Sequence, residues 1–451
     1  MKTTAVILAA GQGTRMKSKL PKVLHQALGK PMVQWVLDCL SQAGVQDKIA
    51  VLGHGGEQVA PVVGQQAAVV YQTEQLGTGH AVMQAAPALP ADNDCVLVIC
   101  GDTPLLRAET IRQLIAQHAR EGNAVTILTA CTENPTGYGR IVRQGQQISA
   151  IVEQKDASEE QKQIKEINTG TYCFDQKFLL QFLSALDTNN AQKEYYLTDL
   201  IKIANQNQLP VGGFVLADFN ESLGVNNRVQ LSQAEAILRQ RKNEAVMLAG
   251  VTLLDPAATY IGADVQIGSD TVIYPNVVLE GHTVIGSGNV IGMNCRFVDS
   301  SIGDDNDIQS TVIVESTVGS GCKIGPMAYL RPGTALADHV KIGDFVEVKK
   351  SQVGEGSKIP HLSYVGDSVV GSGVNIGCGT ITCNYDGVNK YQTTIKDGAF
   401  IGSNTNLVAP VTVEKNAFIG AGSTITRDVP ASALAVVRAE LRVKENWRKK
   451  K

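Results

Sequence analysis

A glycine-rich segment near the N-terminus has the residue types that bind phosphate. Gly11 and Gly13 follow a short apolar stretch, and Arg15 and Lys22 follow the glycines. Glycines let backbone N–H groups approach phosphate oxygens, and nearby cations neutralise charge on a transferring phosphoryl group. Gly-x-Gly alone is a weak signal, and the GxxxxGK[ST] spacing of a P-loop is absent. The segment therefore predicts a phosphate site of another kind.

Asp102 lies where an open α/β sheet collects its ligands. It follows the apolar stretch 96–99, and ligands of such sheets gather at the carboxyl ends of the strands. A carboxylate there suits Mg²⁺, whose remaining positions go to substrate phosphates and water. The alternative for this segment alone is that Asp102 caps a helix that begins after Thr103 and Pro104.

A second concentration of polar side chains lies in residues 331–367. His361 has an ordinary pKa of about 6.5, so it can take a proton from an amine at neutral pH. A lone histidine is more often a surface or packing residue, but Arg331, Lys349 and Tyr364 accompany this one. The group predicts an anion site beside a general base.

The first group must be positioned by an α/β sheet. Residues 5–8, 49–52, 96–99 and 125–128 are short and almost continuously apolar, as parallel strands covered on both faces are. Helical patterns, for example over residues 32–43, alternate with these stretches. The alternation predicts a Rossmann-like α/β domain over residues 1–225.

Residues 226–249 predict a long linker helix. Apolar residues recur there at three- and four-residue intervals as far as Leu248. Asn226 or Asn227 can cap its start, and Gly250 can end it. The pattern fits a connector and a last helix of the first domain equally well.

From residue 250 onward, apolar residues recur every six positions. Such a period fits neither a helix nor a meander, but it fits a solenoid of very short parallel strands with anchors stacked inside. Arg331 and Lys349 are eighteen residues apart, or one full coil, so they should stack on neighbouring coils. Residues 383–394 interrupt the repeat and should form a protruding loop. The predicted anchors are Ile261, Ile267, Ile273, Leu279, Ile285, Ile291, Phe297, Ile302, Ile308, Val314, Ile324, Leu330, Leu336, Ile342, Val348, Ile395, Ile401, Leu407, Val413, Ile419 and Ile425.

Composition excludes several classes of protein. The net charge of −3 offers no basic field for nucleic acid, and no apolar run reaches the roughly 18 residues of a membrane span. The nine cysteines form no CxxC pair, which indicates free thiols in a reducing compartment. The N-terminal apolar stretch leads directly into glycines and cations, which argues against a signal peptide. We expect a cytoplasmic protein.

The first half contains a set of chemical motifs in a fixed order. The motifs are Leu-Ala-Ala-Gly-x-Gly-Thr-Arg-Met at 8–16, Pro-Lys at 21–22, Gln-x-x-x-Leu-Gly-Thr-Gly-His at 72–80, Gly-Asp at 101–102, Pro-Thr-Gly-Tyr-Gly-Arg-Ile at 135–141, Ile-Val-Glu at 151–153, Glu-Ile-Asn-Thr-Gly at 166–170 and Gly-Val-Asn-Asn-Arg at 224–228. This ordered set resembles the sugar-1-phosphate nucleotidylyltransferases. With the hexad solenoid, the chain resembles, over almost its entire length, the family of bifunctional N-acetylglucosamine-1-phosphate uridylyltransferase/glucosamine-1-phosphate acetyltransferases.

For the first half, the resemblance implies transfer of UMP from UTP to N-acetylglucosamine 1-phosphate, with release of pyrophosphate. Arg15 and Lys22 would stabilise charge, and Asp102 and Asn226 would bind Mg²⁺. The product would supply peptidoglycan and lipopolysaccharide synthesis. The implied nucleotide and sugar positions are Leu8, Ala9, Ala10, Gly11, Gln72, Gly77, Thr78, Gly139, Glu153, Asn168 and Asn226.

For the second half, the resemblance implies a left-handed parallel β-helix that acetylates glucosamine 1-phosphate with acetyl-CoA. His361 would be the general base, and Glu347 would orient or polarise it. The family also implies a homotrimer with acetyl-CoA at the subunit junctions. The implied sugar-phosphate positions are Arg331, Lys349, Tyr364 and Asn375, and the acetyl-CoA positions are Cys378, Asn384, Tyr385, Ser403, Ala421 and Arg438.

Three positions depart from the family pattern. Cys100 replaces the usual Tyr, and Cys378 replaces the usual Ala. The pair Ile359-Pro360 before His361 is bulkier than the pair expected in the family. The basic C-terminal tail is either a solvated segment or a cover for the acetyl-CoA phosphates. Two other functions remain open: a nucleotidylyltransferase whose solenoid only assembles the oligomer, and a non-catalytic regulatory subunit.

Overall fold

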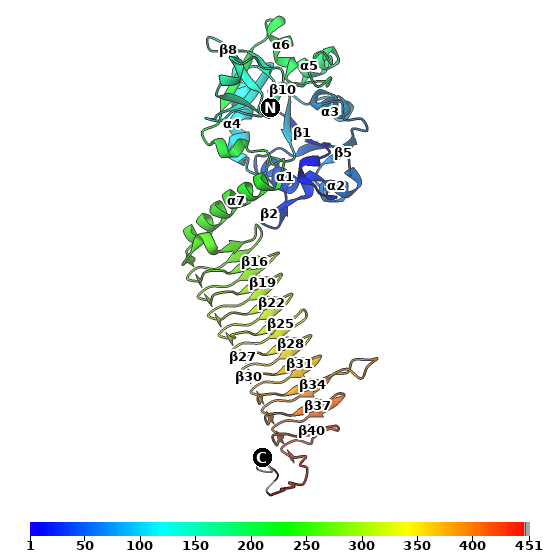
Figure 1. Cartoon of the computed structure of the whole chain (residues 1–451), viewed down its shortest axis with the longest axis vertical. Coiled ribbons are helices and arrows are strands. Elements are labelled where there is room, and N and C mark those ends of the chain that lie inside the picture. Colours follow the sequence, from blue (N-terminus) through cyan, green and yellow to red (C-terminus); the bar gives the residue numbers. More distant parts are fainter. Residues whose placement is uncertain (446, 448–451) are drawn as a thin grey trace. The chain divides into compact units, whose positions relative to one another are not determined.

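The structure is a computed structural model that describes residues 1–445 and 447. The chain forms two compact units, Met1–Leu238 and Arg239–Lys451. The division falls within α7 (Arg228–Leu248), which Figure 1 shows as a long helix. The predicted fold class, an α/β domain followed by a helix and a left-handed parallel β-helix, is confirmed.

The first unit is built on a nine-stranded sheet. Its main path runs β11-β7-β10-β6-β1-β4-β5, and the β8–β9 hairpin extends it from β10. The strands of this sheet are β1 (Thr3–Ala9), β4 (Asp47–Leu52), β5 (Ala68–Tyr71), β6 (Cys95–Cys100), β7 (Val125–Cys131), β8 (Arg140–Gln144), β9 (Gln147–Val152), β10 (Glu166–Asp175) and β11 (Val211–Val215), and a separate small hairpin contains β2 (Gln26–Ala27) and β3 (Lys30–Pro31).

On its main path, the sheet differs from the expected parallel arrangement at one strand. β10 lies between β6 and β7 and pairs antiparallel with both. β1, β4, β5 and β6 are parallel, and β7 is parallel to β11. The four stretches predicted as parallel strands therefore all run in the same direction. Residues 125–128, however, do not pair directly with the other three, because the antiparallel β10 lies between β7 and β6. Hydrophobic periodicity cannot reveal the direction of β10, because a strand buried on both faces has the same apolar pattern whether it runs parallel or antiparallel to its neighbours.

Helices cover both faces of the sheet, which explains the continuous apolar strands. Ala5 and Ile7 face one core with α1, α2 and α4, whereas Val6 faces the other with α3, α5 and α6. The helices are α1 (Met32–Gln42), α2 (Gly56–Val63), α3 (Thr78–Ala85), α4 (Ala108–Glu121), α5 (Gln176–Phe182) and α6 (Asp199–Gln206).

The long helix predicted after residue 225 is present as α7. The side chain of Asn227 accepts a hydrogen bond from the N–H of Gln230 at 2.9 Å, so Asn227 caps the helix. Gly250 follows its end with a φ of +99°. Leu248, part of the apolar pattern, is exposed.

The second unit is a parallel β-helix with three sheets (Figure 1). The first sheet contains β12 (Thr252–Leu253), β15 (Val272–Ile273), β18 (Val290–Ile291), β21 (Asp307–Ile308), β24 (Lys323–Ile324), β27 (Lys341–Asp344), β30 (Lys358–His361), β33 (Asn375–Ile376), β36 (Phe400–Ile401), β39 (Phe418–Ile419) and β41 (Leu434–Ala435). The second contains β13 (Tyr260–Ile261), β16 (Val278–Glu280), β19 (Arg296–Val298), β22 (Val312–Val314), β25 (Tyr329–Leu330), β28 (Glu347–Lys349), β31 (Tyr364–Gly366), β34 (Ile381–Cys383), β37 (Asn406–Val408) and β40 (Thr424–Ile425). The third contains β14 (Gln266–Ile267), β17 (Val284–Ile285), β20 (Ser301–Ile302), β23 (Thr317–Val318), β26 (Ala335–Leu336), β29 (Gln352–Val353), β32 (Ser368–Val370), β35 (Thr393–Ile395) and β38 (Val411–Val413).

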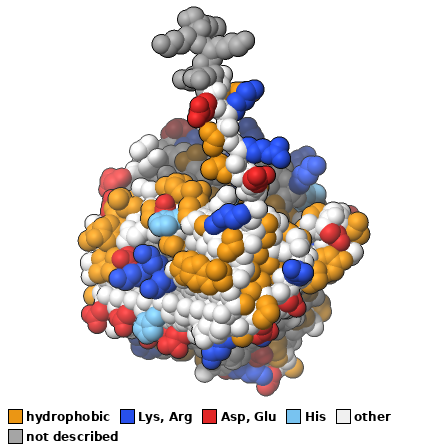
Figure 2. Space-filling view, turned by 90° about the horizontal axis from the view of Figure 1, so that it is seen from below, with side chains coloured by type: hydrophobic (Ala, Val, Ile, Leu, Met, Phe, Trp, Pro, Cys, Tyr) orange, Lys and Arg blue, Asp and Glu red, His pale blue; other side chains and the backbone are white. Residues whose placement is uncertain are grey.

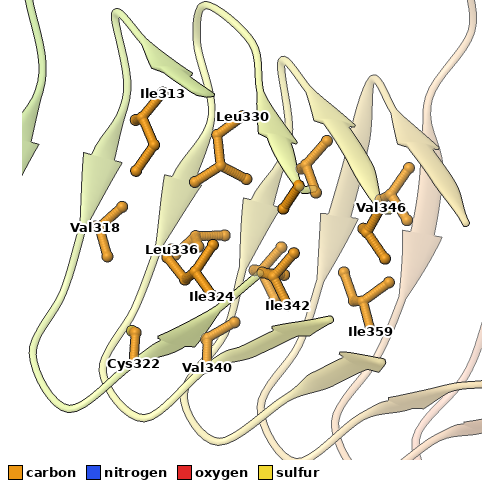
Figure 3. Close-up of a cluster of buried hydrophobic side chains, with 14 of the residues drawn as sticks. Ile313, Val318, Cys322, Ile324, Leu330, Leu336, Val340, Ile342, Val346 and Ile359 are labelled. Atoms are coloured by element: carbon orange, nitrogen blue, oxygen red, sulfur yellow. The ribbon is translucent and has the colours of Figure 1, made fainter. Parts of the chain in front are cut away.

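The predicted anchors belong to one continuous core along the solenoid, and Figure 3 shows a part of it around Ile324 and Ile342. One anchor was predicted wrongly: Ile313 is fully buried, whereas Val314 lies outside the core. Phe297 pairs with Ile313 across sixteen residues, because this coil is two residues shorter than eighteen. Val318, which the strict period did not include, is also buried.

Residues 384–392 leave the solenoid between β34 and β35, as the interruption of the repeat predicted. Figure 1 shows this segment projecting from the stack. At the C-terminal end, Leu434 and Val437 are exposed, and Figure 2 shows hydrophobic side chains among the polar ones on that end. Within the part of the chain that the structure describes, no helix is long and apolar enough to cross a membrane.

Replacing a stacked anchor should destabilise the solenoid locally. We expect Ile324→Ala to lower the free energy of opening of the surrounding coils by about 3 kcal/mol, because Ile324 is buried between Ile308 and Ile342. Hydrogen exchange of the full-length protein, followed by mass spectrometry, measures this change. Lys323→Ala, on the exposed side of the same strand, should change it by less than about 0.5 kcal/mol. Equal effects of the two substitutions would contradict the stacked core.

Candidate functional sites

A cavity of about 280 Å³ opens at the carboxyl edge of the α/β sheet. It collects side chains and backbone from the ends of β1 and β6, from the segment after β5 and from the start of α3. Most of the residues predicted to bind nucleotide thus share one cavity. Its lining is Leu8, Ala9, Ala10, Gly11, Lys22, Val23, Gln72, Gln75, Gly77, Thr78, Ala81, Cys100, Asp102 and Glu194.

Four predicted residues converge beside this cavity. The Lys22 ammonium forms an ion pair with Asp102, and it lies 3.3 Å from the side-chain oxygen of Asn226. Arg15 donates to the same oxygen at 2.9 Å. Lys22 and Asp102 are both mostly buried, so solvent screens their interaction little. Asp102 does not cap a helix, because α4 begins only at Ala108.

These residues fit a divalent cation. Oxygens of Asp102 and Asn226 both contact the Lys22 ammonium, so the two donors already converge on a cation-sized position. Carboxylate and amide oxygens are ligands that Mg²⁺ accepts. In the described ranges, no group of three or more His, Cys, Asp or Glu side chains could hold a metal ion. A cation here would therefore need further ligands from a substrate or from water.

Two glycines allow the close approaches that form the cavity wall. Gly13 has a φ of +62°, and a Cβ there would lie 2.7 Å from Cβ of Lys22. Gly77 has a φ of +107°, and a Cβ would lie 2.7 Å from the carbonyl oxygen of Tyr195. Only glycine accepts both the positive φ and the contact.

The segment around Tyr195 supplies residues that the sequence analysis missed. Glu194 lines the cavity, and backbone hydrogen bonds join Tyr195 to Leu76 and to Gly79. Thr78 accepts from the N–H of Leu197 at 3.2 Å. Nothing in the local sequence pattern indicated this contact, because it joins segments over a hundred residues apart.

Three residues predicted to contact sugar lie together between β8, β9 and β10. A Cβ on Gly139 would lie 3.2 Å from a carboxylate oxygen of Glu153 and 3.4 Å from Cβ of Asn168. Burial, with the nearby negative charge of Asp156 as a second cause, raises the pKa of Glu153. Asn168 donates to the hydroxyl of Tyr172 at 2.7 Å.

Cys100 connects the sugar positions to the nucleotide cavity. It lines the cavity, and its Sγ lies 3.9 Å from the carbonyl oxygen of Gly170, two residues after Asn168. Burial raises the pKa of the Cys100 thiol to about 12, with a smaller contribution from the charge of Asp102. The thiol therefore fits here as an uncharged packing group.

In the solenoid, one corner collects the predicted catalytic and acetyl-CoA residues. The first sheet pairs Asn375 with Phe400, and Phe400 with Phe418. Cys378, Ser403 and Ala421 each lie three residues after one of these paired positions, so they stand at equivalent places on successive coils. His361 stands at the equivalent place on the coil before Cys378, because Lys358 pairs with Asn375. Backbone contacts confirm the stacking: a Cβ on Gly377 would lie 2.6 Å from the N of Ser403, and one on Gly402 would lie 2.4 Å from the N of Ala421.

Beside His361 the structure corrects one expectation. Nδ1 of His361 lies 2.6 Å from Oδ1 of Asp344, its register partner on β27. Glu347, expected to orient or polarise His361, instead accepts a hydrogen bond from Arg331 at 2.7 Å. The sequence analysis missed Asp344, because it took one coil as eighteen residues whereas Asp344 and His361 are seventeen apart.

The cations predicted to bind a phosphate do stack. Tyr329 and Leu330 pair with Glu347 and Val348, which places Arg331 next to Lys349 on the adjacent coil. Tyr364 follows on the next coil of the same sheet. Asn375 lies on a different sheet, where it pairs with Lys358, so the structure does not bring it to the cations of the same chain.

The projecting loop adds groups to this cluster. The amide of Asn384 hydrogen-bonds to Asp367 and lies 3.4 Å from the Tyr364 hydroxyl. Contact with the Lys349 ammonium lowers the pKa of Lys390. The sequence analysis did not name Lys390, although the interrupted repeat pointed to this segment. Tyr385 is exposed on the loop.

Arg438 closes the lower end of the corner column, where its guanidinium contacts the carbonyl oxygen of Ala421. The rest of the predicted basic tail contains residues 446 and 448–451, which lie outside the described residues. Pro360 is part of strand β30, and a Cβ on Gly343 would overlap its carbonyl oxygen. The substitution before His361 therefore lies in a closely packed strand.

An α/β sheet with a glycine-lined cavity at its carboxyl edge, followed by a hexapeptide β-helix, defines a nucleotidyltransferase joined to a hexapeptide transferase. Residues 5–164 match the model of the MobA-like NTP transferase domain. Residues 256–353 match the GMPPB C-terminal domain, and residues 392–427 match the bacterial transferase hexapeptide with six repeats.

Relatives match almost the whole chain. The Bifunctional protein GlmU of Heliobacterium modesticaldum is 56% identical over 99% of this chain and 98% of the relative. The proteins of the same name from Carboxydothermus hydrogenoformans and Clostridioides difficile are 55% and 51% identical, over 98% and 100% of this chain and 99% and 98% of the relatives. This chain belongs to the GlmU family of bifunctional enzymes.

The raised pKa of Cys100 predicts its behaviour toward thiol reagents. At pH 8 only about one Cys100 in ten thousand would be thiolate, because its pKa is about 12. We expect iodoacetamide to label the exposed Cys131 of the native protein and to leave Cys100 unlabelled, as peptide mass spectrometry would show. In denaturant both should react. Equal labelling rates in the native protein would contradict the buried, uncharged thiol.

Proposed function

We propose that this enzyme makes UDP-N-acetylglucosamine in two reactions, one in each unit. Glucosamine 1-phosphate is first acetylated by acetyl-CoA, and N-acetylglucosamine 1-phosphate then takes UMP from UTP. The observation that carries the proposal is that two separate groups of functional side chains exist, one around Lys22 and Asp102 and the other around His361. The relatives' description as bifunctional supports the same conclusion.

In the uridylyl transfer, a phosphate oxygen of the sugar attacks the α-phosphorus of UTP, and the bond to pyrophosphate breaks. The attacking oxygen is already anionic, so no general base is needed. Arg15 and Lys22 neutralise charge on the transferring group. Asp102 and Asn226 would hold Mg²⁺, which when bound supplies charge neutralisation to the phosphates.

The cavity residues hold the two substrates in line. The uridine part takes the backbone of Leu8, Ala9, Ala10 and Gly11 together with Gln72, Gly77 and Thr78, all of which line the cavity. The sugar lies against Gly139, Glu153 and Asn168, next to the cavity wall at Cys100.

In the acetyl transfer, the amine of glucosamine 1-phosphate attacks the thioester carbon of acetyl-CoA. His361 takes a proton from the amine as the C–N bond forms, the C–S bond breaks, and CoA leaves. Arg331 and Lys349, with Tyr364 and the added Lys390, bind the sugar phosphate. The backbone N–H of Cys378 stabilises the thioester oxyanion.

Acetyl-CoA follows the corner column of Cys378, Ser403 and Ala421 toward Arg438. Asn384 and Tyr385 of the projecting loop contact it from the side. Asn375 is displaced from the cations of its own chain, which supports a homotrimer in which a second subunit completes the site. The nine free cysteines accord with a cytoplasmic enzyme.

Two substitutions should separate the two reactions. We expect Asp102→Ala to reduce pyrophosphate release at least about a hundredfold and leave CoA release unchanged, because the sites lie in different units. His361→Ala should reduce CoA release about a hundredfold or more and leave pyrophosphate release with pre-acetylated sugar unchanged. An assay with glucosamine 1-phosphate, acetyl-CoA, UTP and Mg²⁺ measures both products.

The control is Asp92→Ala, which removes only a surface ion pair with Lys2. Loss of both activities in either active-site variant would refute separate sites. Pyrophosphate release alone from the unmodified enzyme, and only with pre-acetylated sugar, would show a single-activity nucleotidylyltransferase. Release of neither product would show a non-catalytic protein.

A thiol beside the thioester should make acetyl transfer sensitive to alkylation. We expect a maleimide to inhibit CoA release more than pyrophosphate release, and acetyl-CoA to protect, because Cys378 occupies the corner next to His361. Cys378→Ala should be resistant, whereas Cys131→Ala, which removes an exposed cysteine of the other unit, should remain sensitive. Complete modification of Cys378 without loss of acetyl transfer would disprove its position beside the substrate.

A further inference from the structure

The imidazole of His361 is held by a carboxylate from the preceding coil. Nδ1 of His361 and Oδ1 of Asp344 are 2.6 Å apart, within the range of a strong hydrogen bond. The two residues are register partners on β27 and β30. A Cβ on Gly343 would overlap the carbonyl oxygen of Pro360, so the two strands approach closely immediately before the pair. The contact is therefore set by the backbone stacking as well as by the side chains.

The chemistry of this contact determines which nitrogen of His361 carries a proton. Hydrogen bonding to His361 holds the pKa of Asp344 below its ordinary value, so the carboxyl is ionised at neutral pH and can only accept. Nδ1 must therefore donate. In the neutral imidazole, the other nitrogen, Nε2, is left unprotonated and able to take a proton.

Among the charged groups around this corner, the other carboxylate, that of Glu347, is paired with a cation, and the remaining groups are mainly cations. Glu347 accepts from Arg331, and Arg331 and Lys349 belong to the phosphate cluster. The titratable and charged side chains on the elements packed around the corner are Arg331 after β25, Lys341 and Asp344 on β27, Glu347 and Lys349 on β28, Lys358 on β30, Tyr364 on β31 and Cys378 after β33.

We propose that Asp344 is the positioning residue of the acetyltransferase site, which orients His361 and stabilises its protonated form. The inference rests on the proposed acetyl transfer. As the amine nitrogen bonds to the thioester carbon, its proton moves to Nε2 of His361. The imidazolium then faces the Asp344 carboxylate through Nδ1–H. When the C–S bond breaks, the CoA thiolate takes the proton, and His361 returns to its neutral form.

Two substitutions at Asp344 separate orientation from charge. Asn keeps an oxygen that can accept from Nδ1–H, whereas Ala removes both the acceptor and the charge. We expect Asp344→Ala to lower kcat for CoA release about tenfold or more with little change in KM for glucosamine 1-phosphate. Asp344→Asn should recover part of this loss.

The pH profile distinguishes a positioning role from a purely structural one. The Asp344 carboxylate stabilises the protonated imidazole, so its removal favours the neutral imidazole. The general base must be unprotonated, and the acidic limb of kcat/KM should therefore move to lower pH in Asp344→Asn. Because the pair is partly exposed, we expect a shift of about half a pH unit to one unit. A loss of folding would lower the rate at every pH and leave the limb in place.

Three controls make the result decisive. Asp307→Asn makes the same chemical change two coils earlier, where the carboxylate contacts Gln309, and it should leave the profile unchanged. Pyrophosphate release with pre-acetylated sugar reports the folding of the rest of each variant. His361→Ala shows whether acetyl transfer depends on this histidine at all.

The outcomes distinguish the inference from the proposed function. A shifted acidic limb in Asp344→Asn, with partial recovery of kcat relative to Asp344→Ala, supports the inference. Unchanged kcat and profile in both variants, with His361→Ala inactive, would overturn it and leave the acetyltransferase intact. An unmodified enzyme that releases no CoA would instead refute the proposed function.

Discussion

Each coil of the solenoid can bury its apolar anchors only against the coils before and after it, and this dependence positions the side chains on its surface. Equivalent residues of neighbouring coils stand about 4.8 Å apart, which is the spacing of hydrogen-bonded strands. A polar side chain on one coil therefore lies next to the side chain at the equivalent position of the neighbouring coil. His361 meets Asp344 in this way, whereas Arg331 reaches Glu347 diagonally, because Glu347 is paired with Tyr329. A core of aliphatic side chains thereby determines the geometry of an exposed polar site.

The first unit brings its polar side chains together by strand order instead of by stacking of coils. Arg15, Lys22, Asp102 and Asn226 are separated by up to 211 residues in the chain. Asp102 follows β6, Arg15 and Lys22 lie in the segment after β1, and Asn226 stands just before α7, so strand order brings them together. Burial of the Lys22–Asp102 pair makes their electrostatic interaction stronger than that of surface pairs. This arrangement suits chemistry that depends on charge neutralisation rather than on proton transfer.

Irregularities in the repeat show which parts of the solenoid are constrained. The coil that contains Ile313 is shorter by two residues, yet Ile313 still occupies the core, because a corner can lose residues while the strands keep their register. Residues 384–392 are inserted at another corner, and β34 still pairs with β37 across them. The insertion places Asn384 and Lys390 beside Tyr364 and Lys349 without interrupting the core.

The sequence by itself determined the α/β domain, the long helix after residue 225 and the solenoid, because burial imposes distinct periods on strands, helices and hexad coils. It also predicted Lys22, Asp102 and His361 as candidate site residues, since these residue types stand at strand ends or in a polar cluster. Only the tertiary structure decided that β10 lies antiparallel between β6 and β7, that Glu194 joins the cavity and that Asp344, not Glu347, contacts His361. These contacts depend on strand order and on the length of each coil. The sequence does not reveal them, because the hydrophobic pattern of a strand is the same whichever neighbour it pairs with.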